Sequence, residues 1–127
     1  MKFLITGVGG DIGSGIVRIL RQSFKESKII GTDLKFECLG QVLCDKYYPI
    51  SNAENNTKKW IEDLQKIILR EKIDIFLPTT ESEIIRTPSL NLPKKIKTLI
   101  NDTELVKICL DKHNCLKYLG ERNVEVP

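Results

Sequence analysis

The sequence predicts an α/β domain in which a parallel β-sheet carries helices on both faces. Short apolar runs typical of buried strands alternate with longer segments whose apolar residues recur at helical spacing. A glycine-rich turn, TGVGGDIGSG at residues 6–15, joins the first such strand to the first such helix. The length of 127 residues, with 41% hydrophobic and 29% charged residues, fits a single globular domain over residues 1–127. This order of elements is Rossmann-like.

The first half of the chain is predicted to hold two strands and two long helices. Residues 2–6 form a buried strand, and residues 12–24 form a helix. A second short strand ends near Thr32. The next stretch, up to Pro49, is predicted as a short helix followed by an extended piece. The apolar periodicity of residues 57–71 then predicts a helix.

The second half begins with a third strand in KIDIFLPTT, stopped by Pro78. Two prolines make residues 86–97 irregular, although SEII just before them can begin a helix, and IKTLI is predicted as a fourth strand. Asn101 with Glu104 is a capping-box pattern that opens a helix through residue 109. Asp111 is expected to cap a second helical segment over residues 112–119, with Gly120 as its C-terminal stop.

Composition excludes several classes of function. The net charge is +3, and the basic residues are scattered rather than grouped with aromatic residues, which argues against nucleic acid as a partner. No apolar stretch reaches the ~20 residues of a membrane span, and the N-terminal apolar run is too short for a signal peptide, so we expect a cytoplasmic protein. The four cysteines lack CxxC spacing and are expected to be reduced. The group Cys109, His113 and Cys115 does not lie on one helix face, so no metal site is expected.

Three sequence features are predicted to meet at one edge of the sheet. The carboxyl ends of parallel strands share an edge, where the ligands of open α/β sheets bind. The glycine-rich turn, Asp33 and the segment PTTESE all follow predicted strands. We therefore predict no catalytic residue but a set of substrate- or phosphate-binding residues, namely Gly7, Gly9, Gly10, Asp11, Ile12, Gly13, Asp33, Thr79, Thr80, Glu81 and Glu83.

The glycine-rich turn is open to two interpretations. Gly7 and Gly9 permit a tight turn, and Gly13 lets the helix lie close to the strand, so the glycines can serve chain geometry alone. The same turn and helix N-terminus can bind an anion, and the spacing fits the short-chain dehydrogenase fingerprint with Asp33 as the ribose-binding acid. The dehydrogenase reading lacks the tyrosine and lysine four residues apart that those enzymes use, and the chain is about half their usual length.

A different resemblance covers about 120 residues. In order along the chain it comprises the glycine-rich turn, IIGTDL, CDKYYPI, EKIDIFLPTTESEI and VKICLDKHNCLKYLGERNVEVP. Together these segments resemble the N-terminal, pre-ATP-grasp domain of ATP-grasp enzymes, closest to ligases of the carbamoyl-phosphate synthase type. The matching positions are Gly31, Asp33, Asp45, Lys46, Pro49, Pro78, Thr79, Thr80 and Glu83. The two prolines within residues 86–97 depart from the family, which usually has a longer helix there.

The resemblance implies a domain that helps to hold the non-nucleotide substrate, a small carboxylate or amine, and does not hold a dinucleotide. In such ligases ATP and two magnesium ions activate a carboxylate as an acyl phosphate, which an amine or another nucleophile attacks. The ATP-grasp domain, in cis or in trans, is expected beyond residue 127, so this chain alone is expected neither to bind a cofactor nor to turn over. Lys112 is the position from which the family reaches the nucleotide phosphates. A face made for the ATP-grasp domain predicts a possible homodimer.

For single residues, structural interpretations stand beside the functional ones. Asp33 is favoured as a turn residue or cap over a ribose ligand. Glu81 and Glu83 would bind an amine or a cation, or belong to a solvated loop. A third function, a ligand-free interaction domain, stays open because a fold does not specify a function. We further predict Trp60 in the core, an Asp45–Lys46 surface ion pair, and Tyr47 and Tyr48 half-buried with one hydroxyl facing outward.

Overall fold

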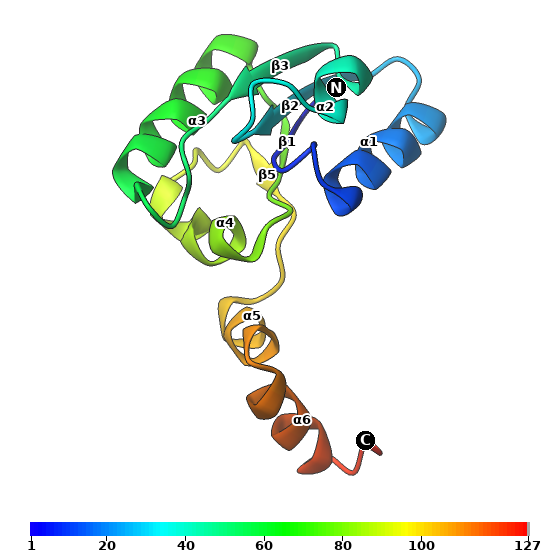
Figure 1. Cartoon of the computed structure of the whole chain (residues 1–127), viewed down its shortest axis with the longest axis vertical. Helices are drawn as coiled ribbons and strands as arrows, with labels where there is room; N and C mark the ends of the chain where they lie inside the picture. Colours follow the sequence, from blue (N-terminus) through cyan, green and yellow to red (C-terminus); the bar gives the residue numbers. More distant parts are fainter. Residues whose placement is uncertain (127) are drawn as a thin grey trace.

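The computed structural model describes residues 1–126 and contains a five-stranded sheet with helices on both faces (Figure 1). All strand pairs are parallel, and the strand order is β3-β2-β1-β4-β5. This confirms the predicted Rossmann-like α/β fold. The strands are β1 (Lys2–Ile5), β2 (Lys28–Asp33), β3 (Lys46–Pro49), β4 (Ile75–Leu77) and β5 (Lys97–Thr98). The helices are α1 (Asp11–Ser23), α2 (Leu39–Leu43), α3 (Thr57–Glu71), α4 (Glu81–Arg86), the 3-10 helix η1 (Thr87–Leu90), α5 (Thr103–Leu110) and α6 (Lys112–Gly120).

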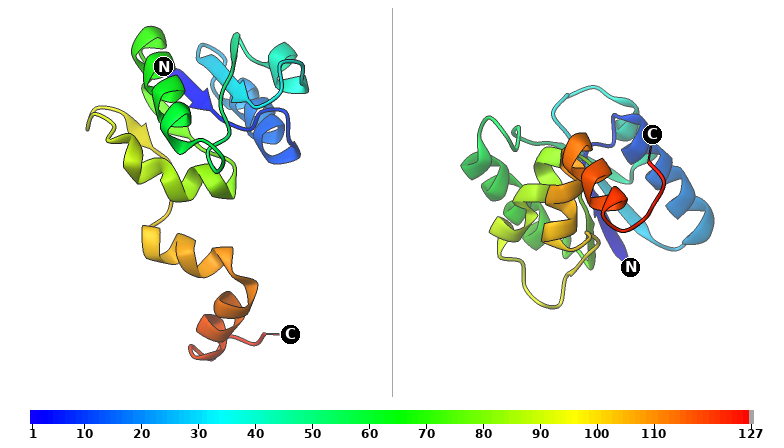
Figure 2. Two further views of the ribbon diagram at one scale, coloured as in Figure 1. Left: turned by 60° about the vertical axis from the view of Figure 1, so that its left-hand side comes forward. Right: turned by 90° about the horizontal axis from the view of Figure 1, so that it is seen from below.

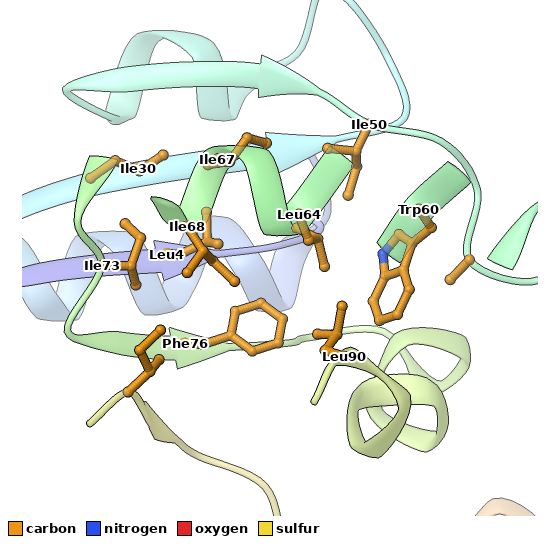
Figure 3. Close-up of a cluster of buried hydrophobic side chains, with 12 residues drawn as sticks. Leu4, Ile30, Ile50, Trp60, Leu64, Ile67, Ile68, Ile73, Phe76 and Leu90 are labelled. Carbon is orange, nitrogen blue, oxygen red and sulfur yellow. The ribbon is translucent and has the colours of Figure 1, made fainter. Parts of the chain in front are cut away.

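Side chains of alternate residues in the central strands pack into two separate hydrophobic cores, one on each face of the sheet. On one face, Leu4 and Phe76 pack with Trp60 of α3 and with η1 (Figure 3). Trp60 is fully buried, which confirms its predicted place in the core. On the other face, Ile5 and Val17 belong to a second cluster, which packs against α1 and α2. Both faces of the sheet are therefore covered, as a parallel sheet requires.

The C-terminal helices α5 and α6 extend away from the sheet, beyond the carboxyl ends of the strands (Figures 1 and 2). Neither helix contains a buried residue. Helices of 8 and 9 residues are marginal without tertiary packing, so this arm gains little stability from the rest of the described chain. Within residues 1–126 no helix combines the length and apolar character that a membrane span needs.

Several local predictions are corrected in this arm. Asp102, not Asn101, caps α5, because its carboxylate accepts from the Glu104 and Leu105 N–H groups. Asp111 caps α6 as expected. Gly120 is the last residue of α6, and the left-handed conformation that follows falls on Asn123 (φ 58°). The family resemblance also implies a short strand in NVEVP; no strand forms over residues 123–126, where the described chain offers no neighbouring strand to pair with, and Pro127 lies outside the described residues.

The predicted Asp45–Lys46 ion pair is wrong. The Asp45 carboxylate contacts Arg21 (2.6 Å) and Lys28 (3.1 Å), whereas Lys46 contacts Glu71 (2.8 Å). Neighbouring residues of an extended chain point to opposite faces, so these two side chains reach different helices. For the same reason Tyr47 donates to the Lys35 carbonyl and Tyr48 to the Glu71 carboxylate. Both rings are half-buried as predicted, but neither hydroxyl is free.

Candidate functional site

The glycine-rich turn after β1 is built around backbone positions that admit no side chain. Gly7 has a φ of +59°, and a Cβ there would lie 2.6 Å from Thr79 Oγ1. A Cβ on Gly13 would lie 2.2 Å from the Gly7 carbonyl oxygen and 2.9 Å from Val8 Cα. Since both contacts are with backbone atoms, α1 can approach β1 only with glycine at position 13. The mechanical role predicted for Gly7 and Gly13 is confirmed.

The N-terminus of α1 follows this turn directly. Gly10 is the N-cap residue, its N–H donates to the Gly7 carbonyl (3.1 Å), and no side chain caps the helix. Within residues 1–126 no acceptor pairs with the N–H groups of Asp11, Ile12 or Gly13. The Asp11 carboxylate, exposed in the first turn, places negative charge where an anion would bind.

Asp33, at the end of β2, holds the glycine-rich turn in place through hydrogen bonds of its carboxylate. Its Oδ2 accepts the Gly9 N–H (2.8 Å), and its Oδ1 accepts the Leu34 N–H (2.7 Å). A Cβ on Gly9 would lie 2.9 Å from Asp33 Oδ2, so glycine at position 9 makes this approach possible. The structure places Asp33 in the turn role that was favoured for it, while its role toward a ribose stays a prediction.

The segment after β4 is hydrogen-bonded to Thr6, the residue directly after β1. Thr6 Oγ1 accepts the Thr79 N–H (3.1 Å) and donates to Glu83 Oε2 (2.6 Å). Thr80 Oγ1 donates to the same carboxylate oxygen (2.7 Å), and Trp60 Nε1 donates to Glu83 Oε1 (3.3 Å). Glu83 is only 6% exposed, so the solvated-loop interpretation is wrong for this residue. Glu81, by contrast, is exposed.

A pocket of about 140 Å³ lies where these segments meet. Four of the predicted residues line it: Gly7, Asp33, Thr80 and Glu83. Its remaining lining residues are Leu34, Ile50, Asn52, Ala53 and Ser82. The lining thus carries two carboxylates and no lysine, arginine or histidine, so a cationic ligand would meet a favourable charge there.

The other predicted residues lie outside this pocket. Thr79 and Glu81 border an adjoining hollow of about 580 Å³, together with Glu54 and Arg86. Gly9, Gly10, Asp11, Ile12 and Gly13 form the turn and the first turn of α1 beside the pocket without lining it. Lys112 is exposed at the start of α6 on the protruding arm.

Sequence reasoning missed the residues that follow β3. Ile50, Asn52 and Ala53 come from the connection between β3 and α3. The Asn52 amide oxygen accepts the Glu54 and Asn55 N–H groups (2.8 and 2.9 Å), which shapes this connection. In the sequence, Pro49 at the end of the predicted extended piece is the feature that marks where this connection begins. If that piece is counted as a parallel strand, its following loop falls at the same edge.

No family model matches this sequence, and a search of curated proteins finds no relative. The fold is shared with solved structures. Glycinamide-RNase-transformylase T from Mycobacterium tuberculosis gives a TM-score of 0.67 at 15% identity, over 100% of this chain and 36% of that chain. The biotin carboxylase domain of a single-chain bacterial carboxylase gives 0.65 at 11% identity, over 99% and 30%. N5-carboxyaminoimidazole ribonucleotide synthetase from Thermotoga maritima gives 0.60 at 15% identity, over 99% and 32%.

These identities mean that the fold, and nothing finer, is what the structures have in common. The chain spans about a third of the length of each of the three proteins. The similarity nevertheless extends over 99–100% of this chain, so it includes the α5–α6 arm as well as the sheet.

Proposed function

We propose that this chain is the substrate-side, N-terminal domain of an ATP-dependent carboxylate–amine ligase of the carbamoyl-phosphate synthase type. Two independent findings support the proposal. The order of sequence segments resembles the pre-ATP-grasp domain, and the three structural neighbours are ATP-grasp enzymes that carry this fold in their N-terminal domains. The α5–α6 arm, which has no buried residue, is a surface that an ATP-grasp domain in cis or in trans would cover.

The observation that carries the proposal is the small pocket at the carboxyl edge of the sheet. Ligands of open α/β folds bind at this edge. Its two carboxylates, Asp33 and Glu83, favour the amine substrate over a carboxylate, because a carboxylate would meet like charge at short range. The Ser82 hydroxyl and the Asn52 amide are further polar groups in the lining.

ATP and magnesium fit poorly to the residues of this chain. No three acidic, cysteine or histidine side chains gather into a possible metal site among residues 1–126. The first turn of α1 carries the negative charge of Asp11, which opposes binding of an anion at this helix N-terminus. Lys112 is the one predicted nucleotide contact, and its exposed ammonium would reach nucleotide phosphates held by the partner domain. In this proposal ATP held by the ATP-grasp domain would supply the phosphoryl group that activates the carboxylate, with ADP as the leaving group, and this chain would bind and orient the amine.

A ligand panel tests the proposal. Thermal unfolding is followed with methylammonium, ethanolamine or glycinamide, with acetate as the anionic control, and separately with NAD(H), NADP(H) and ATP–Mg²⁺. A ligand at 100 times its dissociation constant stabilises by ~2.7 kcal/mol, roughly an 8–10 °C rise for this length. We expect an amine to raise the melting temperature and acetate not to do so.

Two matched variants make the panel specific. Asp33→Asn removes a charge that lines the pocket, and Asp11→Asn removes a charge beside it. The amine effect should fall in the first variant and persist in the second. A rise with a nicotinamide cofactor, lost on substitution of Asp33, would refute the ligase proposal and favour the dehydrogenase alternative. No response to any ligand would favour a ligand-free interaction domain.

A further inference from the structure

A group of exposed apolar side chains lies around α2, on the opposite face of the sheet from α3. Leu34, Phe36, Leu39 and Val42 are 55%, 72%, 48% and 83% exposed. We call these four residues the α2 patch. Apolar side chains exposed singly are ordinary, but four within nine residues form the kind of surface that marks an interaction site.

The local structure forces this patch outward. Gly40 is buried, and a Cβ there would lie 2.0 Å from Val8 Cγ2, so this side of α2 lies directly on the turn after β1. Leu43 also packs against the buried cluster that contains Val8 and Val17. Residues three apart share a helix face, so Leu39 and Val42 lie together on the side that faces away from the domain.

The segment before α2 is fixed in place. The Asp33 carboxylate accepts the Leu34 N–H (2.7 Å), and the Tyr47 hydroxyl donates to the Lys35 carbonyl. Phe36 therefore follows two anchored residues, and two residues after it Cys38 packs against the buried cluster of Val8 and Val17. A surface that is already ordered loses little conformational entropy when it binds a partner.

The charges beside Phe36 match a second copy of the same surface. Lys35 and Glu37 flank Phe36, both are exposed, and neither takes part in an ion pair among residues 1–126. In a two-fold contact centred on Phe36, Lys35 of each copy faces Glu37 of the other, since the same surface is used twice in opposite directions. We propose that the α2 patch is a two-fold interface between two copies of this chain. The proposal does not depend on the ligase assignment.

Sedimentation equilibrium from about 5 to 500 µM tests the interface. Four apolar side chains with a small charged rim make a small contact, so we expect a dissociation constant of roughly 1–100 µM. The weight-average mass should rise toward twice the 14.5 kDa of one chain. Phe36→Ser and Val42→Ser should each raise the dissociation constant at least tenfold. Leu69→Ser, an equally exposed position (80%) on α3, is the matched control and should dimerise like the wild type.

A charge reversal identifies the two-fold geometry. Lys35→Glu and Glu37→Lys should each weaken the dimer by placing like charges opposite each other, and the double variant should restore it. Thermal unfolding of each variant confirms that the fold is kept. A monomer at every wild-type concentration would overturn the proposal, as would larger polymers. So would a dimer that survives Phe36→Ser and Val42→Ser but is lost in Leu105→Ser on α5. Single charge variants that leave the dimer unchanged would rule out the two-fold pairing.

Discussion

Replacing Glu83 with alanine removes an acceptor on which three elements converge. Its carboxylate accepts from the hydroxyls of Thr6 and Thr80 and from the indole N–H of Trp60. Thr6 and Trp60 are fully buried, so their donors cannot turn to bulk water. A hydrogen bond to a charged group contributes about 1.5–3 kcal/mol, and an unsatisfied buried donor costs about 1–3 kcal/mol.

The expected loss is smaller than the sum of the three bonds. Burying the carboxylate without a cation has itself a cost of several kcal/mol, which the variant regains. The hydroxyl of Thr80, which is less buried, can rotate toward the pocket. We therefore expect Glu83→Ala to lower the free energy of unfolding by about 3 kcal/mol, from the unsatisfied indole N–H of Trp60 and the loss of one hydrogen bond to a charged group. For a chain of this length that corresponds to a fall of roughly 10 °C in the melting temperature.

Differential scanning calorimetry with urea unfolding measures this loss. Glu81→Ala is the matched control, since Glu81 lies two residues earlier in the same helix but is exposed. Truncating it removes only a favourable charge at a helix N-terminus, less than about 1 kcal/mol. Glu83→Gln keeps an oxygen acceptor and should fall between the two. If Glu83→Ala and Glu81→Ala unfold within about 0.5 kcal/mol of each other, the hydrogen bonds to Glu83 do not hold the site together.

Two further predictions concern the turn and the pH dependence. Gly13→Ala should lower the free energy of unfolding by about 3 kcal/mol, because its Cβ would lie 2.2 Å from the Gly7 carbonyl oxygen. Gly15→Ala is the control: a Cβ there has nothing within 4 Å, so it should raise the free energy of unfolding by about 0.5–1 kcal/mol. Urea titrations measure both, and equal effects at the two positions would contradict the close approach of α1. Burial of Asp45 favours its neutral form, but the Ile29 N–H and the Arg21 and Lys28 side chains outweigh it and hold the pKa of this carboxyl below its usual value. A carboxyl whose pKa is lowered on folding stabilises the folded state fully above its unfolded pKa, and this stabilisation is lost as the pH falls. Between about pH 5 and pH 3 the free energy of unfolding of the wild type should therefore fall more steeply than that of Asp45→Asn. Parallel plots of unfolding free energy against pH for the two proteins would refute this.

The sequence was enough to predict the edge of the sheet at which the pocket lies. Strand ends in parallel sheets share an edge whatever the side chains do, so the glycine-rich turn, Asp33 and the segment after β4 were placed at one edge, and they meet there because β2, β1 and β4 are neighbours. The short strand β3 was harder to assign as a strand because it lies at the sheet edge and its residues are only partly buried. Without it, the loop that carries Asn52 could not be placed at the site.

The role of Glu83 could not be predicted, because it depends on packing between distant residues. Glu81 and Glu83 both belong to the first turn of α4, yet the first is exposed and the second buried. The difference arises from Thr6, 77 residues earlier, and from Trp60 on α3, both of which donate to Glu83. The Trp60 periodicity predicted a core position but not that its N–H would point at a carboxylate, and buried indole N–H groups generally need such a partner.

The turn itself shows how one backbone arrangement can serve different ligand chemistries. Its glycines bring α1 close to β1 and leave three N–H groups at the helix N-terminus without partners in the described chain, which is the geometry of an anion site. The surrounding charges oppose that use. Asp11 stands in the first turn of α1, and Asp33 already accepts the Gly9 N–H. A pyrophosphate at this turn would approach the carboxylates of Asp11 and Asp33, and the Gly9 N–H is already donated to Asp33 (2.8 Å), whereas an ammonium group in the neighbouring pocket would be attracted by the carboxylates of Asp33 and Glu83. The electrostatics of the edge therefore favour an amine, even though the fold of the turn alone favours a phosphate.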